Sequence, residues 1–304
     1  MIHLKKSKKN RFLFLISLFL LGGLLNACGG VASLIESARF ELDRCNPTKA
    51  ATLSHCTAAL QKATQIQVTD PNNPEAALIA SSANLGLAHF DLLTFAANLA
   101  ELADSNIDDF ERFRTFISDY EADLGIDTDF TDPTIQITEF QDAIAAFDTV
   151  SFTGLATDAN GILEDKLFRR VAFQRGIMQA LETFILPVKI SAGGVTNVDN
   201  ITNSIFTSIQ DSMLNADNSL ILGGTTAEES SDILRPLREN YCRCSLQTGG
   251  LTITCLKDLM RCELYDGTNI EQDYDGNLVV DATTDCAALL NPSGIDSCGA
   301  DDTQ

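Results

Sequence analysis

Histidines are the side chains of this sequence best suited to acid–base or metal chemistry, and only three occur. His3 lies in the basic N-terminus, ahead of an apolar run. His55 adjoins Cys56, and His89 lies in an apolar stretch, so we expect both to be structural. The sequence has no G-x-S-x-G, H-E-x-x-H, Walker or G-x-G-x-x-G motif. The usual signatures of nucleophilic hydrolases, zinc proteases and nucleotide-binding enzymes are therefore missing.

The N-terminus has the order of an export signal. Five basic residues come first: Lys5, Lys6, Lys8, Lys9 and Arg11. The apolar run that follows ends at Leu25 and is shorter than the roughly 20 residues that a membrane-spanning helix needs. Leu25, Ala27 and Cys28 resemble the lipobox of bacterial lipoproteins, with Asn26 where that family usually has a small or β-branched residue. The resemblance implies cleavage before Cys28 and a membrane anchor, a diacylglycerol with palmitate-type acyl chains, on its thiol.

The residues after Cys28 bear on location. In the lipoprotein family an Asp after the cysteine favours retention at the inner membrane, whereas Gly29 and Gly30 follow here. The resemblance therefore implies the periplasmic face of the outer membrane, with the cell surface as the alternative. We expect the two glycines to form a flexible tether between the lipid and the folded domain.

Eight further cysteines fall into two groups. The first is Cys45 and Cys56; the second is Cys242, Cys244, Cys255, Cys262, Cys286 and Cys298. An even number in an exported chain favours disulfides. We expect Cys45 to pair with Cys56 across the Asn46-Pro47 turn, and the connectivity of the other six stays open. The alternative is a zinc site formed by Cys242, Cys244, Cys255 and Cys262, but C-x-C followed by C-x6-C is not a usual zinc spacing. We expect no metal and no cofactor.

Charge defines two further features. Cations gather at Lys166, Arg169, Arg170 and Arg175. We expect these to close internal ion pairs, with an anion or acidic-partner site as the alternative. Acidic residues gather in two loops, at Asp127, Asp129 and Asp132 and at Asp273, Asp275, Asn277 and Asp281. We expect both loops to be solvated, with calcium binding as the alternative.

The balance of charge limits the partners. The chain has 21 Lys+Arg and 42 Asp+Glu. Removal of residues 1–27 takes away five of the basic residues, which leaves 16 against 42 and a formal charge of −26. A field of that sign repels nucleic acid and anionic lipid.

The elements that carry these residues are predicted to be helices, because apolar residues recur at spacings of three and four. The predicted helices are Val31–Asp43, 47–68, 74–103, Asp108–Leu124, Thr138–Val150, Asn160–Leu186, Val198–Asn215 and a short helix near Ile233 that begins at Thr225 or Thr226. Pro187 is predicted to follow the end of the sixth helix. The fold class is all-α, an irregular multi-helix bundle or a short α-solenoid.

The region around Pro71 resembles the tetratricopeptide repeat family. The matching residues are Ala59, Ala63, Asp70, Pro71, Asn72, Asn73, Ala76, Ala80, Ala83 and Gly86. The aromatic residues of that repeat are replaced by Ala63, Ala77 and Asn84, and no 34-residue period recurs. The resemblance implies a repeat-like helical hairpin, and the chain is also similar to helical lipoproteins that accompany solute transporters.

The sequence divides into four segments. Residues 1–27 are the signal peptide, 28–30 the anchor and tether, 31–240 a helical domain and 241–304 a small disulfide-rich region. In the last segment we predict short strands at Leu251–Thr254 and a hairpin at Asp275-Gly276. We expect a lipid-anchored protein of the cell envelope that binds or scaffolds a protein or small molecule without catalysis. An accessory lipoprotein of a solute transporter is the first alternative, and a carboxylate-dependent hydrolase is the second.

Overall fold

The described part of the chain is helical. The computed structural model describes residues 30–91, 95, 117–122, 134–191, 202–226, 230, 252–255 and 257. Within these residues the β-structure is an isolated bridge between Thr157 and Leu163, and every longer element is a helix. The all-α prediction is confirmed for this part of the chain.

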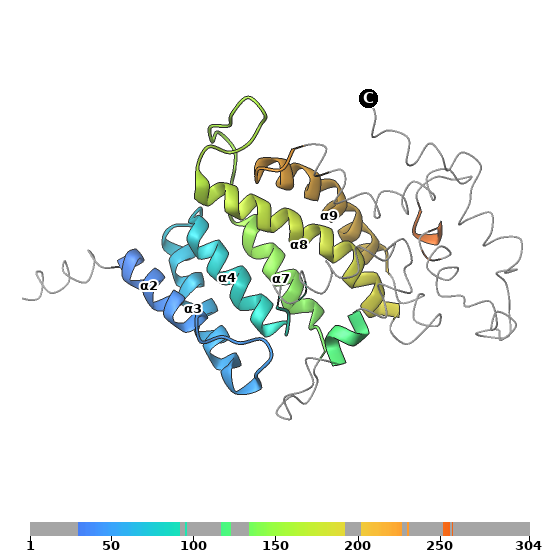
Figure 1. Cartoon of the computed structure of the whole chain (residues 1–304), viewed down its shortest axis with the longest axis horizontal. Coiled ribbons are helices and arrows are strands. Elements are labelled where there is room, and N and C mark those ends of the chain that lie inside the picture. The colour runs from blue at the N-terminus through green and yellow to red at the C-terminus, as the bar shows by residue number, and fades with distance from the viewer. Residues whose placement is uncertain are drawn as a thin grey trace, which may run out of the picture.

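The helices follow one another in antiparallel order (Figure 1). Their bounds are α2 Gly30–Leu42, η1 Ala50–Thr52, α3 Leu53–Thr69, α4 Pro74–Leu87, α7 Ile137–Asp148, α8 Lys166–Ser191 and α9 Asn203–Leu222. Each α-helix packs against the next one in this series, and α4 also contacts α2 and α8. The long helix α8 therefore lies between α7 and α9, whereas α2 and α3 lie on the other side of α4.

The second predicted helix begins later than expected. Pro47 and Thr48 lie in a turn in which the Asn46 side chain accepts a hydrogen bond from the Thr48 amide at 2.9 Å. The Asn46 amide donates to the Thr52 hydroxyl at 3.1 Å. These local bonds compete with helical ones, so the regular helix starts only at Leu53, after η1.

The third predicted helix ends much earlier than Ala103. The α3–α4 turn matches the prediction, since the Asn73 side chain caps α4 by accepting from the amides of Glu75 and Ala76 at 3.1 and 2.9 Å. At the far end His89 adopts φ 58°, and the Phe90 amide bonds the Leu85 carbonyl at 2.9 Å. This is a Schellman-type end, which the apolar pattern of the stretch concealed.

The sixth predicted helix is shifted toward the C-terminus. Residues 158–165 form a loop that the Asp158 and Asp165 side chains hold, and α8 starts at Lys166. Asp165 Oδ1 accepts from the amides of Leu167 and Phe168, as an N-cap residue does. The helix continues past Pro187 to Ser191, so the prediction that Pro187 follows its end is wrong. Proline removes one helical hydrogen bond there without ending the helix.

The other predicted helices have mixed outcomes. α7 matches its predicted bounds closely, and α9 starts at Asn203 because Thr202 caps it. Residues 117–122 are helical, as the fourth predicted helix requires. The Ser230 amide bonds the Thr226 carbonyl at 2.9 Å, in keeping with a helix that starts near Thr226. The rest of those two helices lies outside the described residues.

The C-terminal strand prediction differs from the structure where the two can be compared. Ile253, Thr254 and Cys255 are helical. The Thr252 hydroxyl accepts from the Cys255 amide at 3.1 Å, which is a helix-capping bond that competes with the strand propensity of the β-branched residues. The predicted hairpin at Asp275-Gly276 lies outside the described residues.

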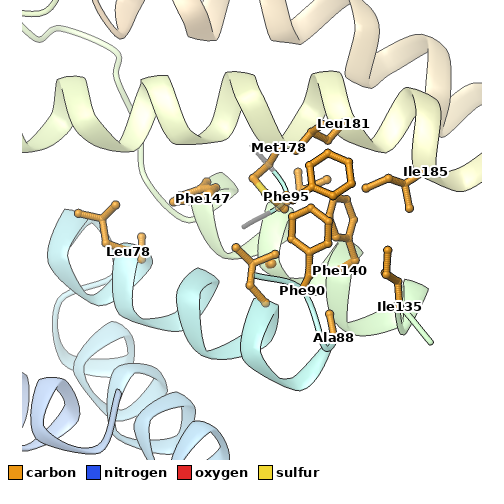
Figure 2. Close-up of a cluster of buried hydrophobic side chains, with 14 of the residues drawn as sticks. Leu78, Ala88, Phe90, Phe95, Ile135, Phe140, Phe147, Met178, Leu181 and Ile185 are labelled. Atoms are coloured by element: carbon orange, nitrogen blue, oxygen red, sulfur yellow. The ribbon is translucent and has the colours of Figure 1, made fainter. Parts of the chain in front are cut away.

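The main core lies where α4, α7 and α8 meet, and aromatic rings fill its centre (Figure 2). The Phe90 ring lies 4.8 Å from Phe95 and 5.2 Å from Phe140, centroid to centroid. Tyr120 packs on Phe95 at 5.5 Å, and its hydroxyl accepts from the Asp91 amide at 2.6 Å. Burial raises the pKa of this phenol. The cluster ties the residues after α4 to α7 and α8.

Candidate functional site

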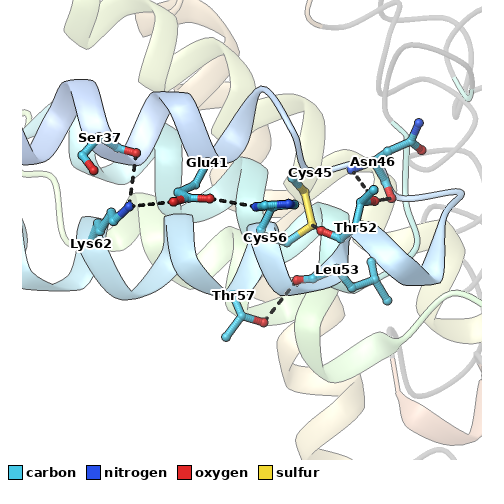
Figure 3. A network of polar contacts seen from close by, with 10 residues as sticks. Ser37, Glu41, Cys45, Asn46, Thr52, Leu53, Cys56, Thr57 and Lys62 are labelled. Atoms are coloured by element: carbon cyan, nitrogen blue, oxygen red, sulfur yellow. Dashed lines mark hydrogen bonds and ion pairs between the residues drawn. A yellow bond between two sulfur atoms is a disulfide. The ribbon is translucent and has the colours of Figure 1, made fainter.

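The predicted Cys45–Cys56 disulfide is present, and it links the turn after α2 to α3 (Figure 3). The bond packs against Gly86 of α4: a Cβ on Gly86 would lie 2.3 Å from Cys45 Sγ. Any larger residue at that position would therefore collide with the disulfide. The three N-terminal helices meet at this point, which assigns a structural role to the cysteine pair.

His55 belongs to a charged network beside the disulfide. Its Nδ1 lies 2.8 Å from Glu41 Oε2, and Lys62 Nζ lies 3.0 Å from Glu41 Oε1 (Figure 3). Hydrogen bonds from His55 and then from Lys62 lower the pKa of Glu41. Both partners of Glu41 lie on α3, so the network reinforces the α2–α3 contact. The structural role predicted for His55 fits this arrangement.

Glu182 is the most unusual polar residue in the described part of the chain. Its side chain lies on the buried side of α8 and is 4% exposed. Gln141 of α7 donates to Glu182 Oε1 at 2.8 Å, and Ser208 of α9 donates to the same oxygen at 3.3 Å. Ser212 of α9 donates to the other oxygen. The ion pairs of the described residues do not include Glu182, so neutral donors from two helices stabilise its carboxylate.

A second polar contact between α8 and α9 lies about one helical turn before Glu182. Gln179 of α8 accepts from the Ser219 hydroxyl at 3.1 Å, and both side chains are buried. We call Gln179, Glu182, Ser212 and Ser219 the α8–α9 polar seam. Sequence reasoning missed it, although polar residues at 179 and 182 interrupt the apolar stripe of Met178, Leu181 and Ile185. Such a break in a stripe is the signal that could have found it.

The geometry of the α8–α9 polar seam indicates a structural role, in which it holds α8 and α9 together. Glu182 is 4% exposed, and hydroxyl and amide donors bond both of its carboxylate oxygens. Helices α8 and α9 are closely packed next to the Gln179–Ser219 contact, where a Cβ on Gly176 would lie 2.7 Å from Leu220 Cγ. The seam therefore fixes the position of α9 along α8.

The predicted basic cluster lies on the first three turns of α8. Arg175 pairs with Asp148 of α7 at 2.7 Å, as the expectation of internal ion pairing requires. Lys166, Arg169 and Arg170 take part in none of the ion pairs between described residues. Lys166 and Arg170 are exposed and Arg169 is half-buried. The expectation is thus met at Arg175 alone among the residues that the structure describes.

An exposed aromatic ring adjoins these cations. Phe173 is 39% exposed and lies one turn after Arg169 and Arg170. Its backbone is in close contact with Gly223, where a Cβ would lie 2.5 Å from Phe173 Cα. No motif in the sequence singles out Phe173. Phe173 therefore lies on the same stretch of α8 as three cations.

Several predicted site residues lie outside the described residues. They are Cys28, Cys242, Cys244, Cys262, Cys286, Cys298 and both acidic loops. Cys255 is described and is disulfide-bonded. Within the described ranges, no group of three or more His, Cys, Asp or Glu side chains is arranged to hold a metal ion. The helices of those ranges include none that is long and apolar enough to cross a membrane.

Comparison with known proteins gave no relatives. No protein-family model matches the chain, and searches of curated proteins and of solved structures returned no match.

Proposed function

We propose that the protein is a lipid-anchored component of the cell envelope that binds or scaffolds another molecule and does not act as an enzyme. The observation that carries this proposal is the order of residues 1–28, in which a basic segment and an apolar run lead to Leu25-Asn26-Ala27-Cys28. Gly29 after the cysteine favours the periplasmic face of the outer membrane. The cell surface is the alternative location.

The position of α2 adds a geometric detail to this proposal. Gly30 is the first residue of α2. A lipid on Cys28 would then be separated from the first helix by Gly29 alone. The anchored protein would hold α2, and through the disulfide also α3, close to the bilayer surface.

The binding part of the proposal is supported by the contrast between enclosed and exposed polar groups. The Glu182 carboxylate and the His55 ring both serve contacts between helices. Exposed cations and an exposed ring gather instead on the outer side of α8, where a partner has access. Exposed positive charge can attract a partner of the opposite sign.

The anchor is tested by Cys28→Ser in the producing cell, with Gly29→Ala as the matched control. The wild type and Gly29→Ala should be found in the membrane fraction at the mature size. Cys28→Ser, or globomycin treatment of the wild type, should leave a longer precursor without lipid, because the thiol that takes the lipid is missing or the signal peptidase is blocked. Maturation of Cys28→Ser to the wild-type size would contradict the anchor.

The binding role is tested separately by photo-crosslinking in intact cells. A photoreactive amino acid is placed in turn at three exposed positions on different helices, Phe40, Val68 and Leu214, and at Arg170. A scaffold or binding protein should give discrete adducts of higher mass from at least one position. Adducts from none of them, with normal amounts of anchored protein, would contradict the binding role.

A further inference from the structure

One face of α8 carries cations and an aromatic ring at helical spacing. Lys166, Arg170 and Phe173 follow at intervals of four and three residues, which places them on the same side of the helix. Arg169 lies next to them. We call these four residues the α8 basic face. It is a local patch of positive charge on a chain whose formal net charge is −21.

The cations of this face are not used to hold the helices together. Arg175, two turns further along, pairs with Asp148, and Lys189 near the other end of α8 pairs with Glu121 at 2.5 Å. Among the described residues, no ion pair reaches Lys166, Arg169 or Arg170. Their charge therefore remains available to a molecule that approaches from solvent.

The backbone beneath the face is firmly fixed. The Leu163 amide bonds the Leu222 carbonyl at 3.2 Å, which joins the segment before α8 to the end of α9. Gly223 lies against the Phe173 backbone, and Gly224, with φ 108°, lies against the Arg169 side chain. A partner would therefore meet a surface already in place, which reduces the entropy lost on binding.

The start of α8 is poorly suited to a small anion. Phosphate at a helix N-terminus is held by free backbone amides. Here the Asp165 carboxylate takes the amides of Leu167 and Phe168, at 2.8 and 3.2 Å, and places a negative charge where the anion would sit. Recognition must then come from the side chains of the face.

A flat anionic membrane is also a poor match. Glu164 and Asp165 are exposed beside Lys166, so a uniform plane of negative charge would meet carboxylates as well as cations. An extended polypeptide can instead place its carboxylates opposite the cations and an apolar side chain on Phe173. Arginine and aromatic residues are enriched at such protein interfaces.

We propose that the α8 basic face docks an acidic segment of a partner protein, whose carboxylates pair with Lys166, Arg169 and Arg170 while an apolar side chain covers Phe173. This inference rests on the proposed binding function and specifies the surface and the chemistry of the partner.

The test uses the full mature chain and a fluorescent synthetic peptide of alternating Glu and Leu residues. Fluorescence anisotropy gives its affinity for the wild type, for Lys166→Glu/Arg170→Glu and for Arg44→Glu/Lys49→Glu. The second pair is the matched control, because Arg44 and Lys49 are exposed and their reversal changes the net charge equally. Arg44 also lies 5.4 Å from the centroid of the exposed Phe40 ring, so this control likewise tests a cation beside an aromatic ring. Inorganic phosphate and phosphatidylglycerol vesicles serve as the other two probes.

The affinity of the wild type for the peptide should fall as the salt concentration rises. Lys166→Glu/Arg170→Glu should lower that affinity by about tenfold, whereas Arg44→Glu/Lys49→Glu should change it by less than about twofold. Phe173→Ala should lower the affinity for the peptide further. If Lys166→Glu/Arg170→Glu has a lower melting temperature than the wild type, the neutral variant Lys166→Gln/Arg170→Gln replaces it in the binding measurement. An equal loss in both charge variants, no peptide binding at all, or phosphate or vesicle binding that depends on the α8 pair would overturn the inference. Crosslinked adducts at Phe40, Val68 or Leu214 would still support the binding role in that case.

Discussion

The α2–α3 hairpin and the α8–α9 pair are both antiparallel helix contacts, yet different chemistry fastens them. A disulfide and a half-exposed charged network, Glu41 with His55 and Lys62, hold the first. A buried carboxylate with neutral hydroxyl donors and close glycine contacts hold the second. The stability of the α2–α3 contact therefore depends on redox state and pH, and that of the α8–α9 contact depends on buried packing and hydrogen bonding.

The two regions also differ in how many of their cations form ion pairs. In the α2–α3 hairpin two cations hold helices together, since Lys62 pairs with Glu41 and Arg39 pairs with Glu75 of α4, whereas Arg44 and Lys49 are exposed. At the α8–α9 contact, neutral hydroxyl and amide donors satisfy the buried Glu182 carboxylate. Lys166 and Arg170 near the start of α8 are exposed.

The largest expected effect on stability comes from removing the Cys45–Cys56 disulfide. Cys45→Ala with Cys56→Ala should cost about 3 kcal/mol, the chain-entropy value for a loop of this size. Hydrogen exchange of the α2 amides should then rise by about a hundredfold, because that free energy corresponds to two powers of ten. Exchange in α9 should stay as in the wild type. A uniform rise in both helix pairs would contradict the separate fastening of the two regions.

The next effect concerns the polar seam. Ser212→Ala leaves one oxygen of the buried Glu182 carboxylate without a donor and should cost about 2 kcal/mol. Glu182→Leu should cost a similar amount, because it leaves the Ser212 hydroxyl buried without its acceptor. The double variant should cost less than the sum of the two, as measured by a double-mutant cycle in urea unfolding. Strict additivity would show that the two side chains do not interact.

The smallest effect is the pH dependence of the hairpin. The pKa of Glu41 is lowered from 4.5 in the folded protein, so its contribution to stability is present above that value and is lost as the pH falls through the lowered pKa. Glu41→Gln should therefore flatten the fall in melting temperature between about pH 5 and pH 3. Glu36→Gln, an exposed substitution on the same helix, is the control. Equal slopes for the two variants would contradict the role of Glu41.

Local sequence signals predicted much of the fold correctly. Asp70 to Asn73 followed by Pro74 gave the α3–α4 turn, and the spacing of Phe140, Ile144 and Phe147 gave α7. Cys45 and Cys56 were expected to pair because a short turn separates them. In each case the information lies within a few residues of the feature.

The parts that sequence reasoning missed depend on contacts between distant residues. The end of α4 at Leu87, followed by the positive φ of His89, is concealed because the apolar pattern continues into the aromatic core with Phe95. The partners of Glu182 lie on α7 and α9, far from it in the sequence. Whether an α8 cation forms an ion pair depends on where an acidic partner lies. Asp148 of α7 pairs with Arg175, whereas Lys166 and Arg170 are exposed. Such features follow from tertiary packing and not from local periodicity.

The most direct test of the anchored binding protein is the mass of its mature N-terminus. Membrane-fraction protein is digested, and the N-terminal peptide is analysed by mass spectrometry. We predict a peptide that begins at Cys28 and carries a diacylglycerol with its acyl chains. A mature chain that begins at another residue, or an unmodified Cys28 thiol, would contradict the account.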